Sequence, residues 1–112
     1  MGFERLYLAA LRADDPVRAM QRLARDPKLD LKLRRRLAAA DPNGVRLTAL
    51  LVAKLRFERL LNGSAAAAGW FKTDPSNFTQ AFRRYHREVP QTAFFPKAEA
   101  RAFEVWRTQT TL

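Results

Sequence analysis

The dipeptide Asp-Pro occurs four times in this sequence, at Asp15–Pro16, Asp26–Pro27, Asp41–Pro42 and Asp74–Pro75. An aspartate at the N-cap accepts a hydrogen bond from a backbone N–H that has no partner inside the helix, and a proline at the first helical position has no N–H to satisfy. Proline also disfavours helical backbone in the residue before it. Each pair is therefore expected to end one segment and to start a helix.

Apolar residues recur at helical spacing between these positions and predict helices over about residues 3–12, 16–25, 30–39, 42–61, 75–87 and 96–108. Residues 29–33 alternate like a strand, but Leu29, Leu33 and Leu37 also recur every four residues, so a helix is favoured there. Residues 64–68 fit either one more helical turn or a connection of small residues. No segment combines alternating β-branched runs with hairpin turns. The sequence predicts an all-α fold, a single compact irregular bundle of five to seven short helices in one domain, residues 1–112.

The longest predicted helix, residues 42–61, is expected at the centre of this bundle. Its residues Leu47, Leu51 and Leu55 lie four apart and form an apolar stripe. The aromatic side chains of the last two helices need an apolar surface to cover, so we expect them to pack on this stripe. These aromatic residues are Phe78, Phe82, Phe103 and Trp106.

Composition argues against most catalytic chemistry. The chain has no cysteine and one histidine, which excludes disulfides, thiolate chemistry and sites with several histidines. Four of the six aspartates precede proline and are interpreted as helix caps. Glu99 and Glu104 are five residues apart and would diverge on a helix, so no pair of carboxylates for acid–base catalysis is visible. We therefore expect no enzymatic activity, no cofactor and no metal.

The sequence also predicts a cytoplasmic protein that does not enter a membrane. No long apolar run follows the first positive charge at the N-terminus, so no secretory signal peptide is expected. Its uncharged stretches fall short of the roughly 20 residues that a spanning helix needs.

The chain is strongly basic, with 21 Lys and Arg against 11 Asp and Glu and a formal charge of +10. Its densest basic segment, residues 18–36, contains two acidic residues and eight basic ones, Arg18, Arg22, Arg25, Lys28, Lys32, Arg34, Arg35 and Arg36. Three of them recur at i, i+4 and i+7, which is typical of the solvated face of an amphipathic helix. Clustered cations also bind nucleic acid by displacing counterions from phosphates. Both interpretations remain open.

Aromatic residues are concentrated in the other half, since nine of twelve lie in residues 70–112. Phe94 and Phe95 are adjacent and point in different directions, so at least one ring is expected at the surface. Cations precede them at Arg83, Arg84 and Arg87, and these favour a neutral imidazole at His86, which is expected to be a surface side chain. Exposed aromatic rings beside arginines are typical of protein interfaces, so these six residues form a candidate site for a peptide or partner protein.

Residues 69–78, 82–85 and 94–106 carry a family resemblance in the spacing of their aromatic residues. They resemble the small helical domains that accompany, or are fused to, multinuclear non-haem iron oxidases of the methanobactin-biosynthesis type. The resemblance implies a small protein that binds a precursor peptide or the oxidase, while the iron ligands belong to the oxidase. Some related small proteins are described as DNA-binding domains. The basic N-terminal half does not align with this group, and no ligand or catalytic residue is carried over.

These observations together favour a non-enzymatic interaction module that binds a peptide or a partner protein, and the resemblance implies that a peptide-modifying iron oxidase is such a partner. The alternative is a nucleic-acid-binding protein that uses the basic surface from Arg18 to Arg36.

Overall fold

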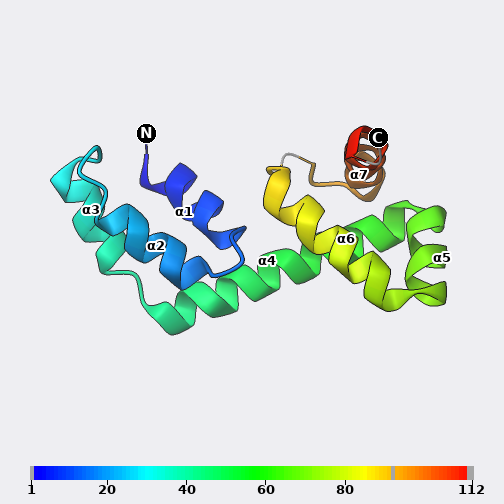
Figure 1. Ribbon diagram of the computed structural model, residues 1–112, viewed down its shortest axis with the longest axis horizontal. Coiled ribbons are helices and arrows are strands. Elements are labelled where there is room, and N and C mark those ends of the chain that lie inside the picture. The colour runs from blue at the N-terminus through cyan, green and yellow to red at the C-terminus, as the bar shows by residue number, and fades with distance from the viewer. Residues whose placement is uncertain (1, 92, 111–112) are drawn as a thin grey trace. The chain divides into compact units, whose positions relative to one another are not determined.

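A computed structural model describes residues 2–91 and 93–110 of the chain and contains seven helices and no strand within those ranges. The helices are α1 (Phe3–Leu11), α2 (Pro16–Ala24), α3 (Leu31–Ala38), α4 (Pro42–Gly63), α5 (Ala65–Thr73), α6 (Pro75–Glu88) and α7 (Pro96–Thr110) (Figure 1). The prediction of an all-α fold with five to seven helices is confirmed. None of the helices in the described ranges is both long and apolar enough to span a bilayer.

Three of the four Asp-Pro pairs start a helix as predicted. The carboxylate of Asp15 accepts a hydrogen bond from the backbone N–H of Arg18 at 3.1 Å at the start of α2. Asp41 accepts from Gly44 at 2.9 Å at the start of α4. The cap at α6 has the same form, since Asp74 accepts from the backbone N–H three residues later at 3.3 Å.

The prediction that Asp26–Pro27 also starts a helix is wrong. Asp26 accepts a hydrogen bond from the backbone N–H of Lys28 at 2.9 Å, which makes a turn of the kind that aspartate forms with the residue two positions later. The helix begins only at Leu31, after Asp30 has capped it by accepting from Lys32 at 3.0 Å. The predicted helix over 30–39 is therefore confirmed as α3. Residues 64–68, for which the sequence allowed either a helical turn or a connection, form the start of α5, and Ser64 is its N-cap.

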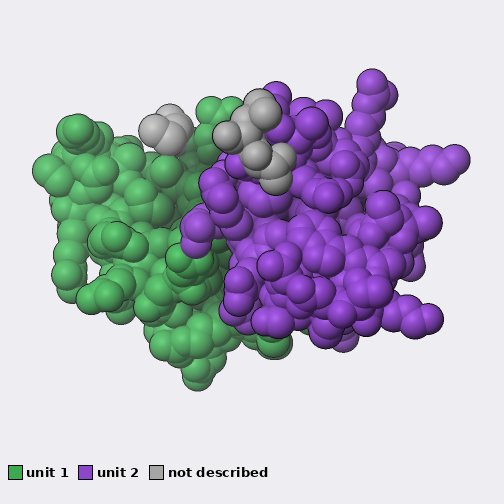
Figure 2. Space-filling model, turned by 45° about the vertical axis from the view of Figure 1, so that its right-hand side comes forward, with its two compact units in different colours: residues 1–52 green, residues 53–112 purple. Residues whose placement is uncertain are grey.

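The chain divides into two compact units, residues 1–52 and 53–112, coloured separately in Figure 2. The sequence predicts one core, whereas the structure holds two clusters of buried residues, one in each unit. The cluster of unit 1 contains Leu6, Ala10, Leu11, Met20, Leu37, Val45 and Ala49. The cluster of unit 2 contains Leu60, Ala67, Phe78, Phe82, Tyr85 and Phe103.

Helix α4 contributes to both clusters, but through a different face from the predicted one. Its buried positions are Val45 and Ala49 in unit 1 and Arg56 and Leu60 in unit 2, which follow one another at spacings of four, seven and four residues. The predicted leucine stripe is exposed, because Leu47, Leu51 and Leu55 keep 58%, 49% and 54% of their surface accessible. The prediction that these leucines are core residues is wrong.

The aromatic residues of α5, α6 and α7 do form a core in unit 2, around Phe78. The Phe78 ring lies 5.2 Å from Trp70 in an edge-to-face arrangement and 5.9 Å from Phe103, measured between ring centroids. A close backbone approach completes this unit, since a Cβ built on Gly63 would lie 2.0 Å from the carbonyl oxygen of Pro96. Only glycine fits at the end of α4 for this reason.

Candidate functional site

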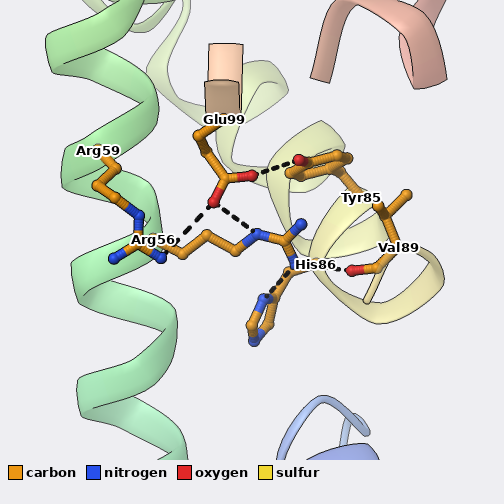
Figure 3. Close-up of polar contacts among 6 residues, drawn as sticks. All are labelled: Arg56, Arg59, Tyr85, His86, Val89 and Glu99. Atoms are coloured by element: carbon orange, nitrogen blue, oxygen red, sulfur yellow. Dashed lines mark hydrogen bonds and ion pairs between the residues drawn. The ribbon is translucent and has the colours of Figure 1, made fainter. Parts of the chain in front are cut away.

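A buried ion pair joins α4 and α7 inside unit 2. Arg56 Nε donates to Glu99 Oε1 at 3.1 Å, and the two side chains keep only 1% and 0% of their surface exposed. Tyr85, on α6, donates its hydroxyl hydrogen to the second carboxylate oxygen of Glu99 (Figure 3). The carboxylate therefore has a protein donor on each oxygen, as a buried charge requires.

Arg56 also binds the C-terminal end of α6. Its Nη1 atom donates to the carbonyl oxygen of Val89 at 2.7 Å and lies 3.3 Å from Nδ1 of His86 (Figure 3). A second arginine approaches from the next turn of α4, where Arg59 Nη2 lies 3.6 Å from Glu99 Oε1. We call Arg56, Arg59, Tyr85, His86 and Glu99 the buried polar cluster.

The burial of Tyr85 keeps its hydroxyl protonated. Removal from water and the hydrogen bond to Glu99 raise the pKa of Tyr85 far above its ordinary value, and the nearby Arg56 charge offsets this only in part. The Arg56 guanidinium lies 4.3 Å from the centroid of the Tyr85 ring, so the ring also covers the charge.

The arrangement of the buried polar cluster ties three helices, α4, α6 and α7, together. Glu99 has no accessible surface, so a molecule in solution does not reach its carboxylate. Within the described residues, no three His, Asp or Glu side chains lie close enough together to hold a metal ion. Glu104, which was expected to diverge from Glu99 on the same helix, is exposed.

Sequence reasoning missed Arg56 and Glu99 as buried residues because it placed charged side chains at the surface. A signal was present, since Arg56 falls in the same series of α4 as the buried Val45, Ala49 and Leu60. Glu99 likewise precedes Phe103 by four residues, and both have 0% exposure on α7. A charged residue at the same helical spacing as core residues indicates that its side chain is buried.

The six residues predicted to bind a peptide lie in unit 2 in different environments. His86 is 7% exposed and belongs to the buried polar cluster, so its expected surface position is wrong. It stacks on the ring of Phe82 with 5.7 Å between centroids. Phe94 and Phe95 are 68% and 74% exposed before α7. Among the described residues, neither ring stacks on another ring or on a cation.

The three predicted arginines of α6, Arg83, Arg84 and Arg87, are exposed. Arg84 Nε donates to Glu88 at 2.7 Å, and Trp106 Nε1 donates to the other oxygen of the same carboxylate at 3.1 Å. These two hydrogen bonds hold the pKa of Glu88 below its ordinary value, with the larger effect from Trp106. Arg84 is thus paired with Glu88 of its own helix α6, and its guanidinium lies 5.9 Å from the centroid of the Trp106 ring on α7.

The basic segment 18–36 lies in unit 1, on α2, α3 and the turn between them. Seven of its eight cations are exposed, and Arg34 is half-buried. Within the described ranges, none of the eight has a carboxylate within 4.0 Å. Arg36 instead lies over the ring of Phe3, 4.3 Å from its centroid.

The two aspartates that cap α2 and α3, and the aspartate of the turn between these helices, account for these unpaired cations. Asp15, Asp26 and Asp30 are the acidic residues nearest to them in the sequence, and each directs a carboxylate oxygen to a backbone N–H within 3.1 Å. A carboxylate at a helix N-terminus is stabilised by the helix dipole and by that hydrogen bond. The acids that shape unit 1 are therefore turned toward its backbone, and the surface of α2 and α3 is left positive.

No family model, curated protein or solved structure matches the chain.

Proposed function

We propose that this chain is a non-enzymatic module that binds an acidic partner protein. One observation carries the proposal: α4 is apolar on two opposite sides, and only one of them is covered. Leu47, Leu50 and Leu51, which we call the leucine face, keep 58%, 66% and 49% of their surface exposed.

A helix that is apolar all round is normally buried on all sides. On α4 the side with Val45 and Ala49 packs in the core of unit 1, while the leucine face meets solvent. Contiguous exposed apolar surface on a folded protein marks a binding surface, since removing it from water stabilises a complex.

The charge of the chain selects the kind of partner. A second copy would bring another charge of +10 to the interface, and like charges oppose association. An acidic partner is attracted by the same positive charge, and this attraction raises the rate of association. The leucine face then supplies the apolar centre of the interface, with Arg46, which is exposed on α4, as a cation at its edge.

The test is a capture experiment with extract of the source cell, with bound proteins identified by mass spectrometry. Replacing Leu47, Leu50 and Leu51 together with glutamine should leave the far-ultraviolet circular dichroism unchanged and remove the captured acidic protein. Leu8→Gln is the matched control, because Leu8 is 50% exposed on α1. Equal capture by the parent chain and the triple variant would refute the proposal.

Nucleic-acid binding is a second candidate, favoured by the eight cations of α2, α3 and the turn between them, which have no ion-pair partner among the described residues. If this surface neutralises about four to six phosphates, the logarithm of the affinity for duplex DNA should fall with the logarithm of salt at a slope of about −4 to −5. Reversing the exposed Arg22, Lys32 and Arg35 to glutamate should remove that binding. A titration at low salt without micromolar affinity would eliminate this candidate.

A further inference from the structure

Unit 1 contains a pocket of about 280 Å³ between α2, the end of α3 and the start of α4. Its floor is formed by Met20, Leu37 and Val45, each at most 3% exposed. Its rim includes two exposed residues, Gln21 of α2 and Arg25, which directly follows that helix. The pocket therefore combines an apolar interior with a polar and positively charged edge.

The size and lining of the pocket favour one bulky apolar side chain as occupant. Pockets for drug-sized ligands and cofactors run from about 300 to 1,000 Å³, so this volume lies below that range. The remaining lining is apolar and offers no side-chain hydrogen bond to a polar group; it comes from Val17, Ala24, Ala38, Ala40 and Pro42. A leucine or phenylalanine side chain of another protein matches these properties.

The charges around the pocket indicate what accompanies that side chain. Val17, Gln21 and Ala24 line the pocket from one side of α2, and Arg25 lies at its edge. Arg18 and Arg22 are exposed on the adjoining side of the same helix. Among the described residues, none of these three arginines has an ion-pair partner. Carboxylates next to the inserted side chain would meet them.

We propose that this pocket binds an acidic peptide segment, which inserts one leucine or phenylalanine side chain and places flanking carboxylates against Arg25 and its neighbours on α2. The segment is part of the partner protein, so the inference rests on the proposed function, although it uses a different side of unit 1 from the leucine face. The apolar pocket favours a peptide over nucleic acid, because a phosphate backbone carries no apolar group that fills it.

The probe is a short fluorescein-labelled synthetic peptide of glutamate residues around one central leucine, titrated with the full chain. A peptide of equal charge with serine in place of leucine is the reference. Burying a leucine side chain contributes enough free energy that the leucine peptide should bind about tenfold or more tightly than the serine peptide. Equal affinities would overturn the proposal.

Variants of the chain locate the binding site. Ala24→Leu fills the pocket and should reduce the affinity for the leucine peptide about tenfold, to that of the serine peptide. Ala38→Leu fills it from the exposed rim, where a larger side chain does not disturb the core, and should act in the same direction. Ala39→Leu is the matched control, since Ala39 is exposed and does not line the pocket. Unchanged affinity in both folded pocket variants would overturn the assignment.

Charge variants complete the experiment. Arg25→Gln should weaken binding of both acidic peptides several-fold, and Arg35→Gln, which removes a charge outside the pocket, should have the smaller effect.

A competition experiment distinguishes a peptide from nucleic acid as the ligand. If unlabelled duplex DNA displaces the peptide and binds Ala24→Leu as tightly as it binds the parent chain, nucleic acid is the ligand and the peptide assignment is wrong. The variant of the leucine face should keep full peptide affinity. Its peptide binding therefore separates a failure of the pocket from a failure of the proposed function.

Discussion

Replacing Glu99 with glutamine keeps the size of the side chain and removes its charge, which leaves Arg56 buried without a counterion. Removing one partner of a buried ion pair costs about 3–5 kcal/mol. Glutamine still offers one oxygen to Tyr85 or Arg56, so we expect a loss near the lower end, about 3 kcal/mol. Arg56 and Glu99 are 1% and 0% exposed, so water does not replace the lost charge without opening unit 2.

Urea unfolding followed by tryptophan fluorescence measures this loss. Trp70 and Trp106 both lie in unit 2, so the signal reports the unit that contains the ion pair. With a slope of about 1–3 kcal/mol per molar urea, the midpoint should fall by about 1–3 M.

Glu104→Gln is the control for this substitution. It breaks a surface pair with Arg107, at 3.3 Å on the same helix, and should cost less than about 1 kcal/mol. Combining Arg56→Met with Glu99→Leu should recover only part of the stability, because an apolar pair needs no counterion but leaves the buried Tyr85 hydroxyl without its acceptor. If Glu99→Gln costs no more than Glu104→Gln, the ion pair does not stabilise unit 2 and our reasoning is refuted.

Four further substitutions test the packing of the two units, and a fifth tests the buried Tyr85 hydroxyl. Leu60→Ala should lower the free energy of unfolding by about 2–5 kcal/mol, because Leu60 is fully buried. Leu51→Ala should lower it by less than about 1 kcal/mol, because Leu51 is exposed. Urea unfolding followed by circular dichroism distinguishes these two values. Gly63→Ala should strongly lower the melting temperature, because the added Cβ would collide with the backbone of Pro96. Gly69→Ala should stabilise α5 by about 0.5–1 kcal/mol, because no atom lies within 4 Å of its added Cβ. Equal melting temperatures of the two variants would contradict the structure. The raised pKa of Tyr85 means that folding favours its protonated form, so this stabilisation is complete below pH of about 10 and declines as pH rises above it. An alkaline titration by phenolate absorbance should show a phase that accompanies unfolding and is absent in Tyr85→Phe.

Local chemistry in the sequence determined where most helices begin. Asp15, Asp41 and Asp74 each precede proline, and capping involves only residues within one turn, so these starts could be read directly. Asp26–Pro27 was the exception, because aspartate and proline serve a turn as well as a helix start. The choice between these two depended on Asp30, which caps α3 four residues later.

The candidate sites were predicted only in part. The basic surface of α2 and α3 was visible in the sequence because charge is carried by residue type. The pocket beside it was not, since it depends on how three helices meet. The predicted peptide site was divided by the structure, which exposes Phe94 and Phe95 but draws His86 into the buried polar cluster.

The sequence by itself determined the helical class, most helix boundaries and the positive charge, because these follow from interactions between neighbours in the chain. Only the tertiary structure decided which side of α4 is buried. The periodicity of that helix offers an apolar face with Leu47 and Leu51 and another that includes Arg56, and the first is the more hydrophobic. Arg56 is buried because Glu99, 43 residues later, supplies its counterion inside unit 2. Tertiary packing decides whether two charged residues so far apart in the sequence come into contact, and helical periodicity carries no information about such packing.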